Sequence, residues 1–342
     1  MRRGLLRCGA AALLFGASTP FAARLTADMG PVLLAGLLYL GAALAVRPQS
    51  LRRPPSVAGL RRGAGRLTLA VLFGGLVGPI LLMLGLARTP AASASLLLNL
   101  ELPFTVLLAG ILFREHLGPR VVLGAGLVAG AGALVALSAG TPSVQVGGLL
   151  VAAACLAWAV DNVVTADLDE LAPAHITLVK GVVAGTLSTV VGLASGGLPA
   201  VGPLFLALLV GALGYGVSIT LWVAGARDLG AARAQVVFAT APFLGAVLAW
   251  VVLREGITVA QIAGLVVAIS GVALLLRSSH EHEHEHPAQE LDHEHTHDDG
   301  HHDHQHTPEV PVGTRHQHPH SHEALVHAHP HMPDLHHRHP HP

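Results

Sequence analysis

Long apolar runs separated by short polar segments fill the first 277 residues of this 342-residue chain. A helix needs roughly 17–25 mostly apolar residues to cross the hydrocarbon core of a bilayer, and these runs have that length. Backbone groups cannot remain unpaired in lipid, and the runs lack the alternating pattern of barrel strands, so the pattern predicts helices. We expect ten spans, at about residues 5–23, 30–46, 67–86, 91–113, 119–138, 145–165, 175–195, 202–225, 230–253 and 258–276.

Two stretches of the chain, Gly85–Leu137 and Ala224–Leu276, repeat one another. Each contains an Arg at a short turn, a Pro-Phe pair inside an apolar run, an Arg-Glu turn and a last apolar span. A duplicated block of membrane-length spans is typical of transporters. We therefore predict two five-helix repeats, residues 1–139 and 140–277, followed by a separate tail over residues 278–342.

The first span has the outline of a cleaved signal peptide, with Arg residues, an apolar run and then small residues. It also has a counterpart in the second repeat, because Phe15-Gly16 occupies the place of Trp158-Ala159. A segment that belongs to a repeat is part of the folded protein, so we expect this run to be retained as the first membrane helix.

The distribution of Arg residues predicts the orientation of the chain in the membrane. Fourteen Arg residues near span ends fall on the side of the N-terminus, and three, Arg24, Arg88 and Arg254, fall on the other side. Positive residues gather on the cytoplasmic side, which predicts a bacterial inner (cytoplasmic) membrane protein with both termini in the cytoplasm. Since each repeat has an odd number of spans, we predict an all-α integral membrane protein with two inverted-topology repeats, as in alternating-access carriers.

Composition agrees with a membrane protein and separates the tail from the rest. Hydrophobic residues make up 52% of the chain and charged residues 12%, whereas soluble domains have about 25% charged residues. Residues 1–277 hold 18 Lys/Arg and 9 Asp/Glu (+9), and residues 278–342 hold 2 and 12 (−10) together with 22 of the 24 His. With only Cys8 and Cys155 in the chain, no disulfide framework is predicted.

Three charged residues fall well inside the predicted spans, and Glu101 is the first of them. It lies near the middle of the fourth span, close to Asn99 and to Pro103, which frees a backbone carbonyl one turn earlier. Charges inside a membrane are costly and mark functional sites. The Glu101 carboxyl is expected either to take up a proton or contact a cationic substrate group, or to hold helices together as a neutral, hydrogen-bonded acid.

Asp161 and Lys180, the other two, flank a turn between the sixth and seventh spans. At about 1.5 Å rise per residue they lie at similar shallow depths in neighbouring antiparallel helices. We expect an ion pair across this hairpin, with Asn162 as a further partner. A structural or gating role is favoured over a contact with substrate.

These features together resemble a known family. Two inverted halves of five spans, each ending in a Pro-containing helix, an Arg-Glu turn and a Gly-rich last helix, are similar to EamA-like transporters of the drug/metabolite transporter superfamily. The matching stretches include SLLLNLELPFTVLLAGILFRE and TAPFLGAVLAWVVLREGITVAQIAGLVVAISGVALLL. The resemblance covers about residues 5–277. It implies a central cavity lined by the first, third and fourth spans and their counterparts, the sixth, eighth and ninth.

Several aromatic and polar residues fall on spans that the resemblance places around this cavity. Aromatic rings there can stack on an organic substrate, although such residues also serve simply to pack neighbouring helices. The candidates are Trp158, Tyr215, Trp222, Gln235, Phe238 and Thr240.

The tail has few apolar residues and no periodicity that could build a core, so we predict that it is disordered. Imidazole and carboxylate groups together suit Zn, Ni, Cu or Co, but no fixed ligand spacing marks a structural zinc site. The predicted ligands of such a non-specific site are His280, His282, His284, His286, His293, His295, His297, His301, His302, His304 and His306.

We therefore predict a membrane carrier of small organic metabolites or drugs, most plausibly an exporter, that acts as a monomer or homodimer. We expect no required cofactor. The sequence indicates only one kind of bound ion, a divalent transition metal on the tail. One alternative is a divalent-metal exporter that gathers ions on the tail, and another is a non-transporting scaffold that buffers or senses metal. No nucleophile motif or phosphate-binding loop is found, so neither an enzyme nor a nucleic-acid-binding protein is expected.

Overall fold

The computed structural model divides the chain into a helical body, residues 1–278, and a separate unit, residues 279–332. The residues described are 2–52, 55, 57–113, 118–138, 140–166, 168, 171–229, 234, 237–276, 280–286, 289–295, 316–322 and 325–331. Three parts of the predictions lie outside these residues. They are Gln235, the first of the two repeated Arg-Glu turns (Arg114-Glu115), and the tail ligands His297, His301, His302, His304 and His306.

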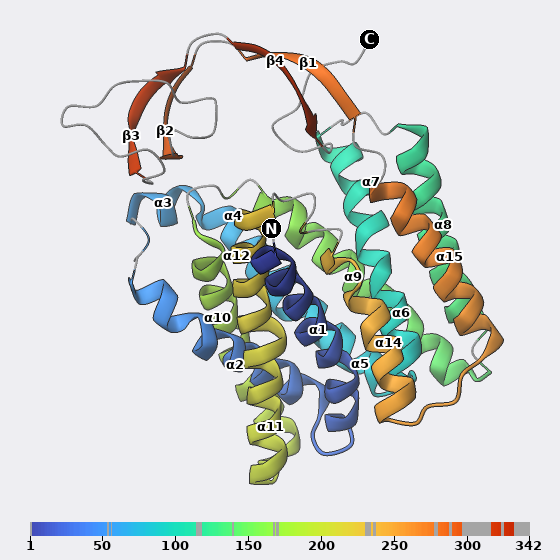
Figure 1. Cartoon of the computed structure of the whole chain (residues 1–342). Helices are drawn as coiled ribbons and strands as arrows, with labels where there is room; N and C mark the ends of the chain where they lie inside the picture. Colours follow the sequence, from blue (N-terminus) through green and yellow to red (C-terminus); the bar gives the residue numbers. More distant parts are fainter. Residues whose placement is uncertain are drawn as a thin grey trace. The chain divides into compact units, whose positions relative to one another are not determined.

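Eight helical spans of the body are long and apolar enough to cross a membrane (Figure 1). Four of the helices, α2, α8, α9 and α10, begin at a proline, which suits the first turn because it needs no backbone N–H there. The eight spans are Arg2–Leu25, Pro31–Arg52, Ala64–Leu86, Ala91–Leu112, Pro119–Leu137, Pro142–Thr165, Pro173–Gly196 and Val201–Gly225.

The helices of the first predicted repeat are α1 (Arg2–Leu25), α2 (Pro31–Arg52), α3 (Val57–Arg62), α4 (Ala64–Leu69), π-helical η1 (Ala70–Val77), α5 (Gly78–Leu86), α6 (Ala91–Leu97), 3-10 turn η2 (Leu98–Leu100), α7 (Glu101–Phe113) and α8 (Pro119–Leu137). Those of the second are α9 (Pro142–Ala166), α10 (Pro173–Gly196), α11 (Val201–Gly211), π-helical η3 (Ala212–Val217), α12 (Ser218–Leu229), α14 (Ala241–Val252) and α15 (Val259–Leu276). The last two are shorter apolar helices. The count of ten spans therefore stays a prediction, because part of the predicted ninth span lies outside the described residues.

Packing of the body pairs equivalent helices of the two predicted repeats. Helix α2 packs along α10, which is its counterpart, and α8 packs along α15. Gly124 and Gly271 meet at the second of these contacts, and a Cβ on either one would lie within 3 Å of the carbonyl oxygen of the other. Close backbone approach through small residues is how helices associate in lipid. By contrast, a Cβ on Gly126 or Gly130 would meet nothing within 4 Å, so these two glycines do not contribute to close helix packing.

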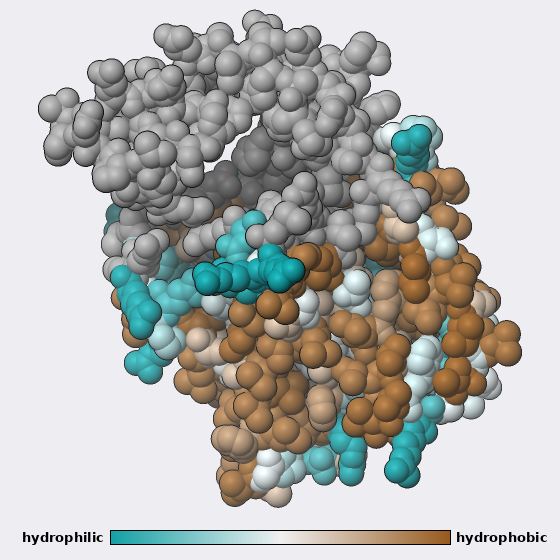
Figure 2. All heavy atoms as spheres, in the orientation of Figure 1, coloured by the Kyte–Doolittle hydropathy of each residue, from teal (hydrophilic) through white to brown (hydrophobic). Residues whose placement is uncertain are grey.

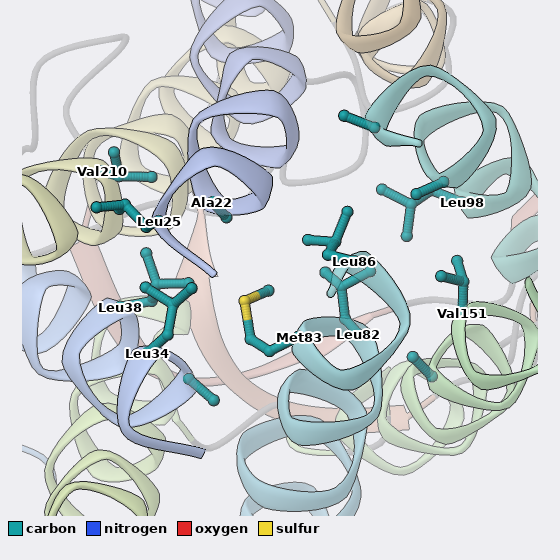
Figure 3. Close-up of a cluster of buried hydrophobic side chains, with 14 of the residues drawn as sticks. Ala22, Leu25, Leu34, Leu38, Leu82, Met83, Leu86, Leu98, Val151 and Val210 are labelled. Atoms are coloured by element: carbon teal, nitrogen blue, oxygen red, sulfur yellow. The ribbon is translucent and has the colours of Figure 1, made fainter. Parts of the chain in front are cut away.

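The core lies where α1, α2, α5 and α11 converge (Figure 3). Met83 of α5 is 1% exposed and lies in one cluster with Leu34 and Leu38 of α2 and with Leu86 of its own helix. Large apolar side chains also cover the outside of the body, including Leu6, Leu137 and Val251, which are 70% or more exposed. Figure 2 shows this apolar surface on the sides of the body, with hydrophilic residues near its ends. An apolar exterior of this kind suits lipid.

The unit at residues 279–332 contains two antiparallel strand pairs. Strand β1 (His280–His286) pairs with β4 (Leu325–His331), and β2 (Gln289–His295) pairs with β3 (His316–His322). The prediction of a disordered tail therefore does not hold for these four segments. Their alternation of His with other residues has the period of two that a strand requires, whereas the prediction rested on the few apolar residues and on the lack of a periodicity that could build a core.

Candidate functional site

The third span carries an interruption in its helix that organises the polar residues of the body. In the π-helical segment η1, the N–H of Gly78 donates to the carbonyl of Phe73 rather than to that of Gly74. The next residue, Pro79, has no N–H to offer. The carbonyl of Gly74 is therefore left without a donor from its own helix, as is common at π-bulges.

Side chains from two other helices donate to this free carbonyl. The hydroxyl of Tyr39, on α2, lies 2.5 Å from the Gly74 oxygen, and Nε1 of Trp158, on α9, lies 3.2 Å from it. A buried carbonyl without a donor is costly in an apolar medium. The two hydrogen bonds remove that cost and fix α2 and α9 against the third span.

The predicted ion pair between Asp161 and Lys180 is present beside the same segment. Nζ of Lys180 lies 2.6 Å from Oδ1 and 2.5 Å from Oδ2 of Asp161, and the two side chains are 13% and 10% exposed. The carboxylate of Asp161 rests directly on Gly74, where a Cβ would overlap it. Glycine at this position thus creates the space that the ion pair fills.

Glu101 accepts a hydrogen bond from Asn162, the residue after Asp161. Nδ2 of Asn162 lies 2.7 Å from Oε1 of Glu101, and it also lies 3.4 Å from the hydroxyl of Thr105. Asn162 was expected as a partner of the ion pair, but its side chain joins α9 to α7 instead. The structure therefore brings Glu101, Asn162, Asp161, Lys180 and Trp158 into one group, which we call the polar cluster together with Tyr39 and the Gly74 carbonyl.

Other candidates lie apart from the polar cluster or reach it only through aromatic rings. Asn99 is buried and donates to the Leu96 carbonyl of its own helix, 3.0 Å away. Thr240 is exposed and donates to the Val237 carbonyl in the turn before α14. The side-chain nitrogen of Trp222 is buried with no hydrogen-bond partner.

A chain of aromatic rings from both repeats extends from the polar cluster. Tyr39 and Tyr215 have ring centroids 5.8 Å apart, and Tyr215 lies 5.8 Å from Phe15. Phe15 lies 5.4 Å from Phe238, whose ring is 6.1 Å from that of Trp222. Tyr39 was not predicted from the sequence, although it is one of only two Tyr and interrupts an otherwise apolar span. That interruption was the available signal.

A cavity of about 410 Å³ opens at the end of the body that carries the loops after α1, α5 and α14. It is lined by Ala23, Arg24, Leu86, Thr89, Ala91, Val252, Leu253 and Glu255. Its lining residues lie at the ends of the first, third, fourth and ninth predicted spans. The central cavity between the two halves stays a prediction. A smaller pocket of about 30 Å³ at the other end is lined by residues that include Val46, Pro173 and Thr220.

Comparison with known proteins agrees with this architecture. An uncharacterized transporter of Methanothermobacter thermautotrophicus is 30% identical over 300 residues, which cover 80% of this chain and 87% of that protein. A solved crystal structure is similar in fold, with a TM-score of 0.59 and 21% identity over 79% of this chain and 94% of the other. The model of the EamA-like transporter family matches residues 2–137 and 145–277. This chain therefore belongs to the EamA-like transporter family and is a multi-pass membrane transporter.

Proposed function

We propose that this transporter exports small organic metabolites or drugs by alternating access between its two halves. Inverted repeats explain why α2 packs on α10 and α8 on α15, because a two-fold axis in the membrane plane pairs each helix with its counterpart. The excess of Arg on the side of the N-terminus supports a bacterial inner membrane location with both termini cytoplasmic.

The observation that carries this proposal is the polar cluster inside an apolar body. Glu101 and Asp161 bring two carboxylates and Lys180 brings one ammonium, so the group holds one acid more than it can pair internally. Isolated charge is expensive in a membrane. A proton on Glu101, or a cationic group of a substrate beside it, balances the cluster, and exchange of one for the other couples transport to a proton gradient.

The aromatic chain supports an organic substrate. Tyr39, Tyr215, Phe15 and Phe238 present large apolar faces that begin at the polar cluster. Small-molecule sites are mostly apolar and aromatic, with a few placed polar groups that fix orientation. The combination of one surplus carboxyl and a row of rings fits a compound with a polar or cationic end and an apolar end.

Replacing Glu101 with Gln tests the proton coupling. Gln keeps an oxygen for Asn162 but cannot ionise, so we expect the pH dependence of uptake into proteoliposomes to disappear. Coupled binding events typically change affinity about 5–150-fold, so transport driven by a pH gradient should fall about fivefold or more. Asp228→Asn is the matched control, because this carboxylate is partly exposed and pairs with Arg7 at the surface. An unchanged pH profile in the Glu101 variant would rule out the coupling.

The tail supports a second candidate, export of a divalent metal such as Zn, Ni, Co or Cu. The backbone register sets His282 opposite His329 and His284 opposite His327 in the β1–β4 pair, and it sets His293 opposite His318 in the β2–β3 pair. Imidazole suits these metals, and the four strand segments are rich in His. No group of three or more His, Cys, Asp or Glu side chains gathers to hold a metal among the described residues, so this candidate rests on the composition and the strand register of the tail.

Exchanging neighbouring residues in β1 tests whether the register matters for metal binding. The variant His282→Glu, Glu283→His, His284→Glu, Glu285→His keeps the composition and moves two His to the other face. We expect it to bind Ni²⁺ about tenfold more weakly than the full chain in calorimetric titration. Equal affinity would mean that composition alone binds metal.

Growth assays separate the two candidates. A host that expresses the full chain, or a chain ending at Arg277, is challenged with the four metals and with a panel of amino acids and drugs. Resistance to an organic compound that survives truncation favours the first candidate, and metal resistance that is lost with the tail favours the second.

A further inference from the structure

The turn after α14 has a backbone conformation that needs explaining. Arg254 has a φ of 55°, the one positive φ among the non-glycine residues that the structure describes. Its side chain is exposed. An L-residue in the left-handed region loses roughly 1–2 kcal/mol, so the turn is maintained by something other than Arg254 itself. What the turn achieves is the placement of Glu255.

Glu255 binds the start of a helix in the other repeat. Its Oε1 accepts a hydrogen bond from the N–H of Ala91 at 2.7 Å, and its Oε2 accepts one from the N–H of Ala92 at 2.8 Å. These are the first amides of α6, which have no acceptor within their own helix. A carboxylate that accepts from two backbone amides makes strong, charge-assisted hydrogen bonds. The second half of the protein thus caps the fourth span of the first half.

A second contact holds the same turn of α6. Nε2 of Gln261 donates to the hydroxyl of Ser93 at 2.9 Å. Gln261 is 4% exposed, and its side-chain oxygen accepts from the N–H of Thr258 at 3.0 Å. We call the pair of contacts, Glu255 to Ala91 and Ala92 and Gln261 to Ser93, the inter-repeat clamp.

Tight packing lies next to the clamp. A Cβ on Gly245 of α14 would lie 2.8 Å from the carbonyl of Gly16 on α1 and 2.9 Å from Oγ of Ser95 on α6. Ser95 is fully buried, one turn along α6 from the amides that Glu255 caps. Three spans from both repeats therefore meet without space for a methyl group. The 410 Å³ cavity is lined by Glu255 and Ala91 and opens at this end.

We propose that Glu255 is a positioning residue that holds the transporter closed at this end, and that the clamp must release before α6 and α14 can separate. The proposal rests on the alternating access proposed above. Opening would part the contact at Ser95 and extend the cavity toward the polar cluster. Weakening the clamp should therefore shift the protein toward the state that is open at this end.

Thiol accessibility in nanodiscs tests this, because both ends of the protein are then in contact with solvent. The background carries Cys8→Ala and Cys155→Ala, which removes both native thiols. One probe is Ser95→Cys, beside the clamp, and the other is Thr220→Cys, in the small pocket at the opposite end. The rate of reaction with a polar maleimide is measured for each probe in the absence of any substrate.

With Glu255→Gln, we expect the Ser95→Cys rate to rise about tenfold, the size expected when a charge-assisted hydrogen bond is lost. The Thr220→Cys rate should fall, because the two open states exclude one another. Glu255→Asp retains the charge and should give a smaller change. Gln261→Leu should act in the same direction as Glu255→Gln. Asp28→Asn, an exposed carboxylate in the loop after α1, is the control and should leave both rates unchanged.

An unchanged Ser95→Cys rate in both Glu255→Gln and Gln261→Leu would overturn the clamp, as would a parallel rise at both probes, which indicates loosened folding. Since no substrate is used, a failed test of Glu101 leaves this result intact. Alternating access itself fails if neither probe reacts in any folded variant.

Discussion

Replacing Lys180 with Met should lower the free energy of unfolding by about 3 kcal/mol, because it leaves the Asp161 carboxylate unpaired inside an apolar body. The side chains of Asp161 and Lys180 are 10% and 13% exposed, so water can replace little of the lost interaction. Thermal unfolding of the purified protein in detergent measures the loss. Asp161→Asn together with Lys180→Met should recover most of it, because neither charge is then buried.

The surface pair between Arg7 and Asp228 provides the control. Its atoms are 2.8 Å apart, but the side chains are 43% and 32% exposed. Exposed pairs contribute about 0–1 kcal/mol, so Arg7→Met should have a small effect. If Lys180→Met were no more destabilising than Arg7→Met, the buried pair would contribute no more to stability than a surface pair does.

The sequence was sufficient to predict the features that depend on strong local physics. Spans such as Pro119–Leu137 and Pro142–Thr165 follow from length and hydropathy alone, because lipid leaves the backbone few choices. The pairing of Asp161 with Lys180 followed from their equal depth in a hairpin and from the cost of leaving either charge alone. The family followed from the internal repeat together with its Pro-Phe and Arg-Glu pairs.

Contacts between distant segments were not predictable in the same way. The partner of Asn162 turned out to be Glu101, because the choice depends on how α7 and α9 are rotated about their axes. Glu255 was predicted only as part of a repeated Arg-Glu turn, since the amides of Ala91 and Ala92 that it caps are 164 and 163 residues away in the chain. Periodicity carries no information on such distances.

The two π-helical segments, one in each repeat, contribute to the same group of contacts around Tyr39. η1 and η3 fall in the third and eighth spans, which occupy equivalent places in the two repeats. Neither the glycine content nor the hydropathy of these spans predicts a π-helix. η1 supplies the carbonyl of Gly74, and η3 supplies Tyr215, whose ring meets that of Tyr39. Tyr39 therefore contacts both π-helical segments, and it is the residue that links the polar cluster to the aromatic chain.

Gly74→Ala is the second substitution expected to have a large effect on stability. It should destabilise the protein, whereas replacing glycine by alanine usually stabilises a helix. Alanine in place of glycine normally stabilises a helix by roughly 0.5–1 kcal/mol. At position 74 the added methyl would overlap the Asp161 carboxylate, so the ion pair and the bonds from Tyr39 and Trp158 must shift. Overpacking costs about 1–3 kcal/mol, and the disturbed pair adds to this. We expect a net loss of about 2 kcal/mol, seen as a lower unfolding temperature, and slower transport.

Gly126→Ala is the matched comparison for this prediction, because it makes the same chemical change in another span. Gly126 lies on an exposed face of α8, where an added Cβ meets nothing within 4 Å. Only the gain in helix propensity remains there, so this variant should unfold at the same temperature or slightly higher. The two substitutions then differ in sign for a single reason, the space that Asp161 occupies on the third span. Equal shifts in both variants would mean that this space is not what fixes the ion pair, and that the polar cluster tolerates movement of the π-helical segment.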